Sequence, residues 1–419
     1  MRLYAFGLKH DTDRPVPVPI LQAPSIRVLW AAWCDAVIAY SNNGDEDGGG
    51  RGGGEEPWPW VLKYVGTGLT AAQKKWLTED GHLKRVSGLG EVVFFGSAMH
   101  DGLRGYIVKS GDRDAECADQ RVVLFGTDME VEDGVPDVQA YSLSENDTTS
   151  IITDVKIDSE GVVLLYMKSR STVEESVVHF ADFRQFQRYF SSGLAPSSPA
   201  PEVTPLPYES HSPPQCVINA TTTTAVDDGM HVWTSTRDPR YPRCLGRPYN
   251  ASSETDIAPL SYLEESYVTK IASGGYMSAA VSSDGEFFLW GQACPGSEGE
   301  LDVLNGSIGA DGLATGIGVD EEQDEFLKCL DVRIEGKGAR VCDVAIGHGH
   351  VLVAAEVCGI GEETKRVLFA AGDNGRTQLG PETGTHFKER FEEVKSMRGK
   401  RIIQLVAAGW SSYIVSDEE

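Results

Sequence analysis

The chain has 419 residues, of which 41% are hydrophobic, enough for a core in one large domain or in two or three smaller ones. Its 63 acidic and 37 basic residues give a formal net charge of −26. This balance argues against a surface that wraps nucleic acid or docks on an anionic membrane, because both need clustered Lys and Arg. It suits a protein with a basic protein partner, and a requirement for solubility explains it equally well.

Targeting signals and cysteine usage limit the cellular compartments in which the protein is expected. The N-terminal residues form no apolar segment of a secretory signal, and no stretch is long enough to span a membrane. The 8 cysteines are scattered, with no CxxC pair. We therefore expect reduced thiols in a cytoplasmic or nuclear protein.

The first part of the chain predicts short strands. Arg2–Gly7 predicts a lone strand, Ile26–Tyr40 predicts two strands, and Trp60–Gly66 predicts a third. Between them, residues 41–57 are acidic and glycine-rich, which predicts a disordered loop. Thr70–Leu77 predicts a helix with a threonine N-cap.

The middle of the chain contains weaker copies of a three-strand unit, in Glu91–Gly126 and Ile151–Phe180. Ala181–Phe190 has aromatics at helical spacing, which predicts a helix packed on a sheet. Residues 191–215 are rich in Pro and Ser, which predicts a long loop inside one domain. The alternative is a hinge between two domains, with three units on one side and four on the other, each an open stack.

The clearest three-strand unit is Val268–Gly291. Asp284-Gly285 predicts its hairpin, because a two-residue turn needs positive φ and glycine adopts it readily. Similar units occur in Cys216–Trp233 and Val341–Gly372. Ile402–Val415 supplies only two strands.

Seven units result if Arg2–Gly7 supplies the missing strand of the last one. The sequence therefore predicts an all-β fold, a closed ring of seven such units, or blades, over residues 1–419 as a single domain. Pairing of the N-terminal strand with the C-terminal blade would close it and remove exposed strand edges. Residues 294–327 are acidic and contain no Lys or Arg, which predicts an insertion loop that is either simply solvated or docks a basic partner.

The units resemble the repeat of the regulator of chromosome condensation family, roughly V-x-x-V-A-A-G-x-x-H-S-x-A-L-x-x-D-G-x-V-Y-x-W-G-x-N-x-x-G-Q-L-G. In this alignment Met277 and Ser412 replace the family histidine in two units. The resemblance implies a seven-bladed propeller. It implies structural roles for the repeat-signature residues Gly274, Asp284, Gly285, Trp290, Gly291, Gly347, His350, Gly372, Gly380 and Gly409.

Within this family, the length, the split N-terminal strand and the segment Asp238–Pro248 resemble the fungal α-tubulin suppressor branch. That resemblance implies an adaptor that pairs with a small metal-binding protein of the CSL zinc-finger type. This partner serves Elongator-dependent tRNA wobble-uridine modification and diphthamide synthesis. The alternative is guanine-nucleotide exchange on a small GTPase, as in the founding member, although that member's basic tail has no counterpart here.

Three large side chains follow the A-G step of the repeat and are candidate partner-binding residues: Trp33, His348 and Trp410. Gly275 has this position in a fourth unit. In the propeller fold the turn opens onto one rim, where exposed aromatics are common binding anchors. The alternative is that these side chains pack between blades.

Two more candidates, Arg240 and Tyr241, lie in the loop after Trp233. They either contact a partner or brace the blade through backbone carbonyls. His348 and His350 could share a metal, but no third ligand is near in sequence and the repeat explains His350, so no metal site is predicted.

Motifs for catalysis are absent from the sequence, including a phosphate-binding loop and a G-x-S-x-G elbow. We therefore expect a non-enzymatic scaffold without a cofactor. We further expect a monomer or heterodimer that makes no direct contact with nucleic acid or membrane.

Overall fold

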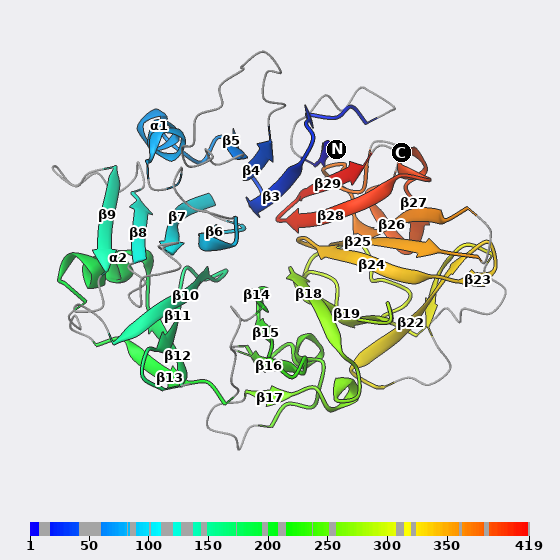
Figure 1. Cartoon of the computed structure of the whole chain (residues 1–419). Coiled ribbons are helices and arrows are strands. Elements are labelled where there is room, and N and C mark those ends of the chain that lie inside the picture. Colours follow the sequence, from blue (N-terminus) through cyan, green and yellow to red (C-terminus); the bar gives the residue numbers. More distant parts are fainter. Residues whose placement is uncertain are drawn as a thin grey trace, which may run out of the picture. The chain divides into compact units, whose positions relative to one another are not determined.

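The computed structural model of the chain describes residues 1–7, 17–41, 60–81, 83, 89–99, 102–109, 120–126, 137–143, 149–172, 174–194, 200–207, 215–236, 238–250, 257–306, 314–319, 324–359, 363–380 and 385–417. These residues are nearly all β, and their antiparallel sheets are the seven blades of a β-propeller (Figure 1). The predicted fold class is therefore confirmed.

The chain divides into two compact units. Unit 1 comprises Met1–Gln22 and Pro214–Glu419, and unit 2 comprises Ala23–Pro213. Four sheets belong to unit 1 and three to unit 2. This division separates the repeats as the two-domain alternative does, so the assignment of residues 1–419 to a single domain stays a prediction.

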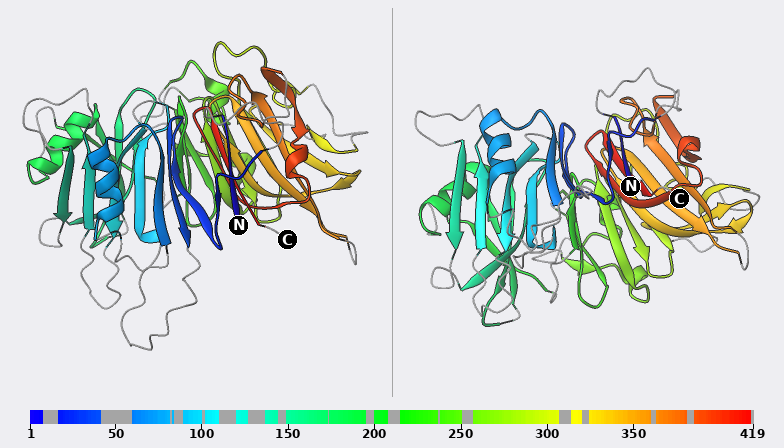
Figure 2. Two further views of the ribbon diagram at one scale, coloured as in Figure 1. Left: turned by 90° about the horizontal axis from the view of Figure 1, so that it is seen from above. Right: turned by 45° about the horizontal axis from the view of Figure 1, so that its top comes forward.

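Both chain ends contribute to one sheet of unit 1, in the order β2-β1-β29-β28. Its strands are β1 (Arg2–Phe6), β2 (Leu21–Gln22), β28 (Arg401–Ala408) and β29 (Ser411–Asp417). β1 pairs antiparallel with β29, with Arg2 opposite Ser416 and Phe6 opposite Ser412. Figure 2 shows the N-terminal strand, in blue, beside the red C-terminal strands. The predicted closure by the N-terminal strand is confirmed.

The other three sheets of unit 1 follow chain order. The first has β14 (Gln215–Ile218), β15 (Thr222–Val226), β16 (Val232–Thr236) and β17 (Ala258–Pro259). The second has β18 (Val268–Gly274), β19 (Met277–Ser282), β20 (Phe287–Gly291), β21 (Gly316–Val319), β22 (Leu327–Ile334) and β23 (Lys337–Gly338). The third has β24 (Arg340–Ile346), β25 (His350–Val357), β26 (Lys365–Asp373) and β27 (Phe387–Glu393).

Unit 2 contains three sheets. The first has β3 (Ile26–Ala31), β4 (Asp35–Ser41) and β5 (Trp60–Gly66). The second has β6 (Val92–Ser97), β7 (Gly102–Lys109), β8 (Gln120–Phe125) and β9 (Val138–Leu143). The third has β10 (Ser150–Ile157), β11 (Val163–Ser169), β12 (Glu175–Phe180) and β13 (Glu202–Pro205).

Both predicted helices are present in unit 2. Helix α1 (Ala71–Glu79) begins after the N-cap Thr70, as predicted. Helix α2 (Phe183–Ser191) begins after Asp182, whose Oδ1 accepts a hydrogen bond from the Gln185 N–H. Three phenylalanines of α2 are buried in one cluster with strands of the second and third sheets, so its aromatics pack on the blades as predicted.

Strands occupy parts of two segments that the sequence analysis assigned to loops. Within 191–215, residues 202–205 form β13 and pair with β12. Within 294–327, residues 316–319 form β21 and pair with β22. Each segment has low strand propensity, but the neighbouring strand offers unpaired backbone groups, and ladder formation satisfies them. Of the predicted disordered loop 41–57, all but Ser41 lies outside the described residues.

The repeat glycines of the third strands pack against the turn of their own blade. Gly291 has φ +108°, and a Cβ there would lie 2.2 Å from the Tyr276 carbonyl oxygen. Gly372 has φ +96° and the same 2.2 Å approach to the Gly349 carbonyl oxygen. Both positions therefore exclude any side chain. These two glycines let the third strands approach the turns that carry the candidate site.

Candidate functional site

Four two-residue turns join the first and second strands of the sheets in unit 1. They are Ala220-Thr221, Gly275-Tyr276, His348-Gly349 and Gly409-Trp410. We call these eight residues the turn row. Backbone hydrogen bonds link neighbouring turns: the Ala220 N–H donates to the Gly275 carbonyl at 2.8 Å, and the His348 N–H donates to the Gly409 carbonyl at 2.6 Å. The main chain therefore links the first turn to the second and the third turn to the fourth.

The structure corrects the alignment of the predicted rim residues. Gly275 and Gly409 both begin their turns, with φ +55° and +54°. His348 also begins its turn, but Trp410 is the second turn residue, in the place that Tyr276 has in its own turn. The predicted alignment therefore places Trp410 one residue away from its true equivalent. The A-G step of the repeat does not show whether its glycine precedes the turn or begins it.

The same shift affects the residue expected at the family's histidine position in the last unit. Ser411 begins β29 opposite Ala408, just as His350 begins β25. Ser412, the predicted replacement, lies one residue further along the strand. Its Oγ still contacts His350, because the Nε2 of that imidazole lies 2.9 Å away.

Two predicted residues, His348 and Trp410, meet in the turn row. Their ring centroids lie 5.7 Å apart in an edge-to-face arrangement with an interplanar angle of 80°. The Arg376 guanidinium lies 5.7 Å from the Trp410 ring centroid. His348 and Trp410 are half-buried. Burial lowers the pKa of His348, and the nearby Asp373 carboxylate opposes this shift, so the imidazole is mainly neutral at pH 7.

Tyr276 of the turn row forms a second aromatic pair, with Tyr241. Their ring centroids are 4.9 Å apart. Tyr241 comes from the loop after β16 and covers the turn of the next sheet, just as Arg376 comes from the loop after β26 and covers Trp410. The sequence pattern indicated Tyr241 as a candidate but not Tyr276 or Arg376.

The two covering loops share a local signal. Asp238 accepts a hydrogen bond from the Arg240 N–H at 3.2 Å, and Asp373 accepts one from the Gly375 N–H at 2.9 Å. Each aspartate thus forms a turn with the residue two positions on, and the residue after that covers the aromatic turn. Alignment of the loops on these aspartates could have identified Arg376.

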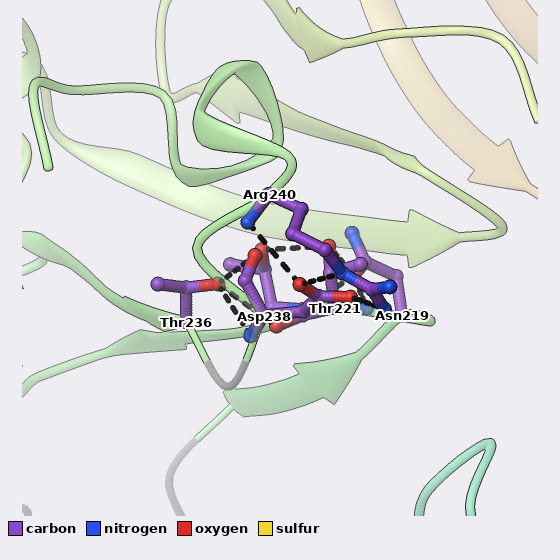
Figure 3. Close-up of polar contacts among 6 residues, drawn as sticks. Asn219, Thr221, Thr236, Asp238 and Arg240 are labelled. Carbon is purple, nitrogen blue, oxygen red and sulfur yellow. Dashed lines mark hydrogen bonds and ion pairs between the residues drawn. The ribbon is translucent and has the colours of Figure 1, made fainter.

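The Arg240 side chain bonds the carboxylate of its own loop, and not the backbone carbonyls that one of the two predicted alternatives named. Its Nε and Nη2 donate to Asp238 Oδ1 and Oδ2 at 2.8 Å and 2.6 Å. Figure 3 shows Arg240 folded back toward Asp238, whose carbonyl accepts a hydrogen bond from Thr236 Oγ1. The Arg240 hydrogen bond lowers the pKa of Asp238. The guanidinium is exposed and lies 5.8 Å from the Tyr241 ring centroid.

The loop after β20, within the segment predicted as an acidic insertion loop, contains the repeat tail. Leu301 is fully buried, as Leu379 is. The Glu300 carboxylate accepts the Ala293 N–H at 2.9 Å, as Gln378 Oε1 accepts a backbone N–H in the later tail. The tail was missed because glutamate replaces glutamine and the loop before it is longer.

Cys294 lies under the turn row at the start of this loop. A Cβ added to Gly275 would lie 2.7 Å from the Cys294 sulfur, so the thiol fills the space that a side chain would need there. Burial, with a smaller effect of Asp373, raises the pKa of Cys294 to about 12. The protonated thiol is therefore a packing group and a poor nucleophile.

Trp33 lies in unit 2, at the first position of the turn Trp33-Cys34. Trp33 is 37% exposed, and its backbone N–H donates to the Ala98 carbonyl at 2.9 Å. The backbone of Trp33 has the same role as that of His348, because both residues begin a turn and donate their backbone N–H to the next turn of their own unit.

His350 is fully buried below the turn row. Ser412 Oγ donates to the Gln378 carbonyl at 2.9 Å, so His350 Nε2 carries the proton that it donates to Ser412. Burial lowers the pKa of His350 to about 3. Within the described ranges, no three His, Cys, Asp or Glu side chains are grouped to hold a metal, and no helix is long and apolar enough to cross a membrane.

Neither a family model nor a curated protein matches this sequence. Solved structures do match it. Human WBSCR16 is 11% identical with a TM-score of 0.52, over 100% of both chains. Prp20p from Saccharomyces cerevisiae is 12% identical with a TM-score of 0.51, over 100% of this chain and 92% of Prp20p. Yeast RCC1 (Prp20), solved bound to Kap60, is 12% identical with a TM-score of 0.50, over 100% of this chain and 89% of that one. At such low identity these matches show the fold alone: the chain is similar to RCC1-like propellers.

Proposed function

We propose that the chain is a non-enzymatic protein-interaction scaffold whose turn row binds a partner protein. The observation that carries this proposal is the repeated display of an aromatic side chain, Tyr276 or Trp410, at the second turn position. A loop from the preceding sheet packs on each of them. Because backbone hydrogen bonds already hold these turns in two pairs, little conformational entropy is lost when a partner binds.

The partner that we propose is a small metal-binding protein of the CSL zinc-finger type. The complex would be a heterodimer, cytoplasmic or nuclear, serving Elongator-dependent tRNA wobble-uridine modification and diphthamide synthesis. Support for this partner comes from the resemblance of the repeats and of Asp238–Pro248 to the fungal α-tubulin suppressor branch. Arg240 and Tyr241, beside the turn row, and Trp33, in unit 2, remain candidate contact residues.

Calorimetric titration of the purified chain with the CSL-type protein tests the proposal. The variants Trp410→Ala and Tyr276→Ala each remove a central aromatic, so we expect binding to weaken at least tenfold, as at interface hot spots (~2 kcal/mol). Val203→Thr changes an exposed residue of unit 2 and should leave affinity unchanged. Unchanged affinity in both aromatic variants would exclude the turn row, and no binding by the unmodified chain would exclude this partner.

A second candidate function is guanine-nucleotide exchange on a small GTPase. It is favoured by the structural similarity to Prp20p, which was described together with its binding to Gsp1p and histones. Release of a fluorescent guanine nucleotide from nuclear and cytosolic GTPases tests it. Acceleration by catalytic amounts of the chain would support exchange and reject a purely adaptor role.

A further inference from the structure

Two hairpins lie side by side in unit 1, at the ends of the strands opposite the turn row. Residues 227–231 join β15 to β16, and residues 283–286 join β19 to β20. Tyr267, which directly precedes β18, lies between them. The Val268 N–H lies 3.4 Å from the Met230 carbonyl, and the Ser283 N–H donates to the Tyr267 carbonyl at 2.8 Å.

Large apolar groups are unusually exposed at this junction. The Tyr267 side chain is 68% exposed and Met230 is 40% exposed. Tyr262, earlier in the connector that leads to β18, is 41% exposed. Tyrosine and methionine are both enriched at protein-binding surfaces, because they combine apolar area with few restrictions on the geometry of a partner.

Carboxylates surround these side chains. The exposed acidic residues of the two hairpins and the connector are Asp228, Glu264, Glu265, Asp284 and Glu286. The basic groups beside them are Arg340, whose Nη2 donates to the Ser283 carbonyl, and His231, which contacts Asp227. We call Met230, Tyr267 and the five carboxylates the hairpin patch. Its net charge is strongly negative, as in the chain as a whole.

We infer that the hairpin patch binds a short basic segment of a second protein partner. An apolar side chain of that segment packs on Met230 and Tyr267, and its Lys and Arg side chains face the carboxylates. A second copy of this chain does not fit, because two acidic patches repel each other. Nucleic acid does not fit either, because its phosphates carry the same sign of charge. Since the hairpin patch and the turn row lie at opposite strand ends, the chain can hold two partners at once.

Fluorescence anisotropy with the full chain tests the inference. The probe is a labelled synthetic peptide of about twelve residues that alternates Lys or Arg with Leu or Phe, with a Glu-containing counterpart as control. We expect the basic peptide to bind, more weakly as salt rises, and the acidic peptide not to bind. Tyr267→Ser and Met230→Gly should each weaken binding at least tenfold, and reversal of Glu264 and Glu265 to Lys should do the same.

Controls separate this surface from unfolding and from the turn row. Met230 has φ 65°, a conformation that suits glycine, so Met230→Gly should keep or raise the unfolding temperature while it weakens binding. Trp410→Ala should bind the basic peptide normally, whatever its effect on the partner of the turn row. Normal binding by Met230→Gly and Tyr267→Ser, equal binding of the acidic peptide, or loss of binding in Trp410→Ala would overturn the inference.

Discussion

At the scale of single residues, the blade depends on glycines that tolerate no side chain. Gly291→Ala would place a Cβ 2.2 Å from the Tyr276 carbonyl oxygen, at φ +108°. We expect the free energy of unfolding to fall by about 2–3 kcal/mol, measured by urea unfolding. Gly338→Ala is the matched control, since its Cβ would meet no atom within 4 Å. Equal stability of the two variants would show that the close approach carries no cost.

The buried imidazole of His350 predicts a pH dependence of stability. Its pKa is lowered from 6.5 to about 3, so the unfolded chain binds this proton more tightly than the folded chain does. The contribution is fully present above pH 6.5 and is lost as the pH falls toward 3, at about 1.4 kcal/mol per pH unit. Urea unfolding between pH 7 and pH 4 measures it. His350→Gln keeps an amide donor for Ser412 but does not titrate, so its stability should fall less steeply over this range; identical slopes would refute the assignment.

At the scale of elements, helix α1 depends on its cap. Thr70 Oγ1 accepts the Gln73 N–H, and the Gln73 side chain bonds back to the Thr70 N–H and to the Gly126 carbonyl. We expect Thr70→Ala to lower the free energy of unfolding by about 1 kcal/mol. Thr78→Ala, at an exposed position of the same helix, should change it by less than about 0.5 kcal/mol. Chemical denaturation distinguishes the two, and a neutral Thr70→Ala would show that packing alone holds α1.

At the scale of the whole molecule, closure depends on the N-terminal strand. Leu3, Tyr4 and Phe6 are buried, and β1 pairs with β29 along its length. Removal of residues 1–7 would expose the edge of β29, so we expect a lower unfolding temperature and aggregation seen by light scattering. A synthetic peptide of residues 1–7 should restore part of the loss. An unchanged, monomeric truncated chain would contradict this role of β1.

The sequence determined the strand units, both helices and the pairing of the chain ends, because local signals specify them. Hairpin glycines, helix caps and alternating apolar residues act over a few residues. The pairing of the chain ends follows because the last unit has only two strands of its own and the N-terminal strand supplies the third. The sequence also identified His348 and Trp410 as candidates. Their contact with each other, however, joins turns of different sheets.

Only the tertiary structure decided which residues face the turn row. Tyr276 and Arg376 take part in contacts between neighbouring sheets, because Tyr241 packs on Tyr276 and Arg376 packs on Trp410. The spacing of residues within one repeat does not show these contacts. The tertiary structure also explains why residues 202–205 and 316–319 form strands. Backbone hydrogen bonds to the neighbouring strand outweigh the weak strand propensity of these residues. Long-range hydrogen bonding and packing therefore made the site from elements that the sequence specified locally.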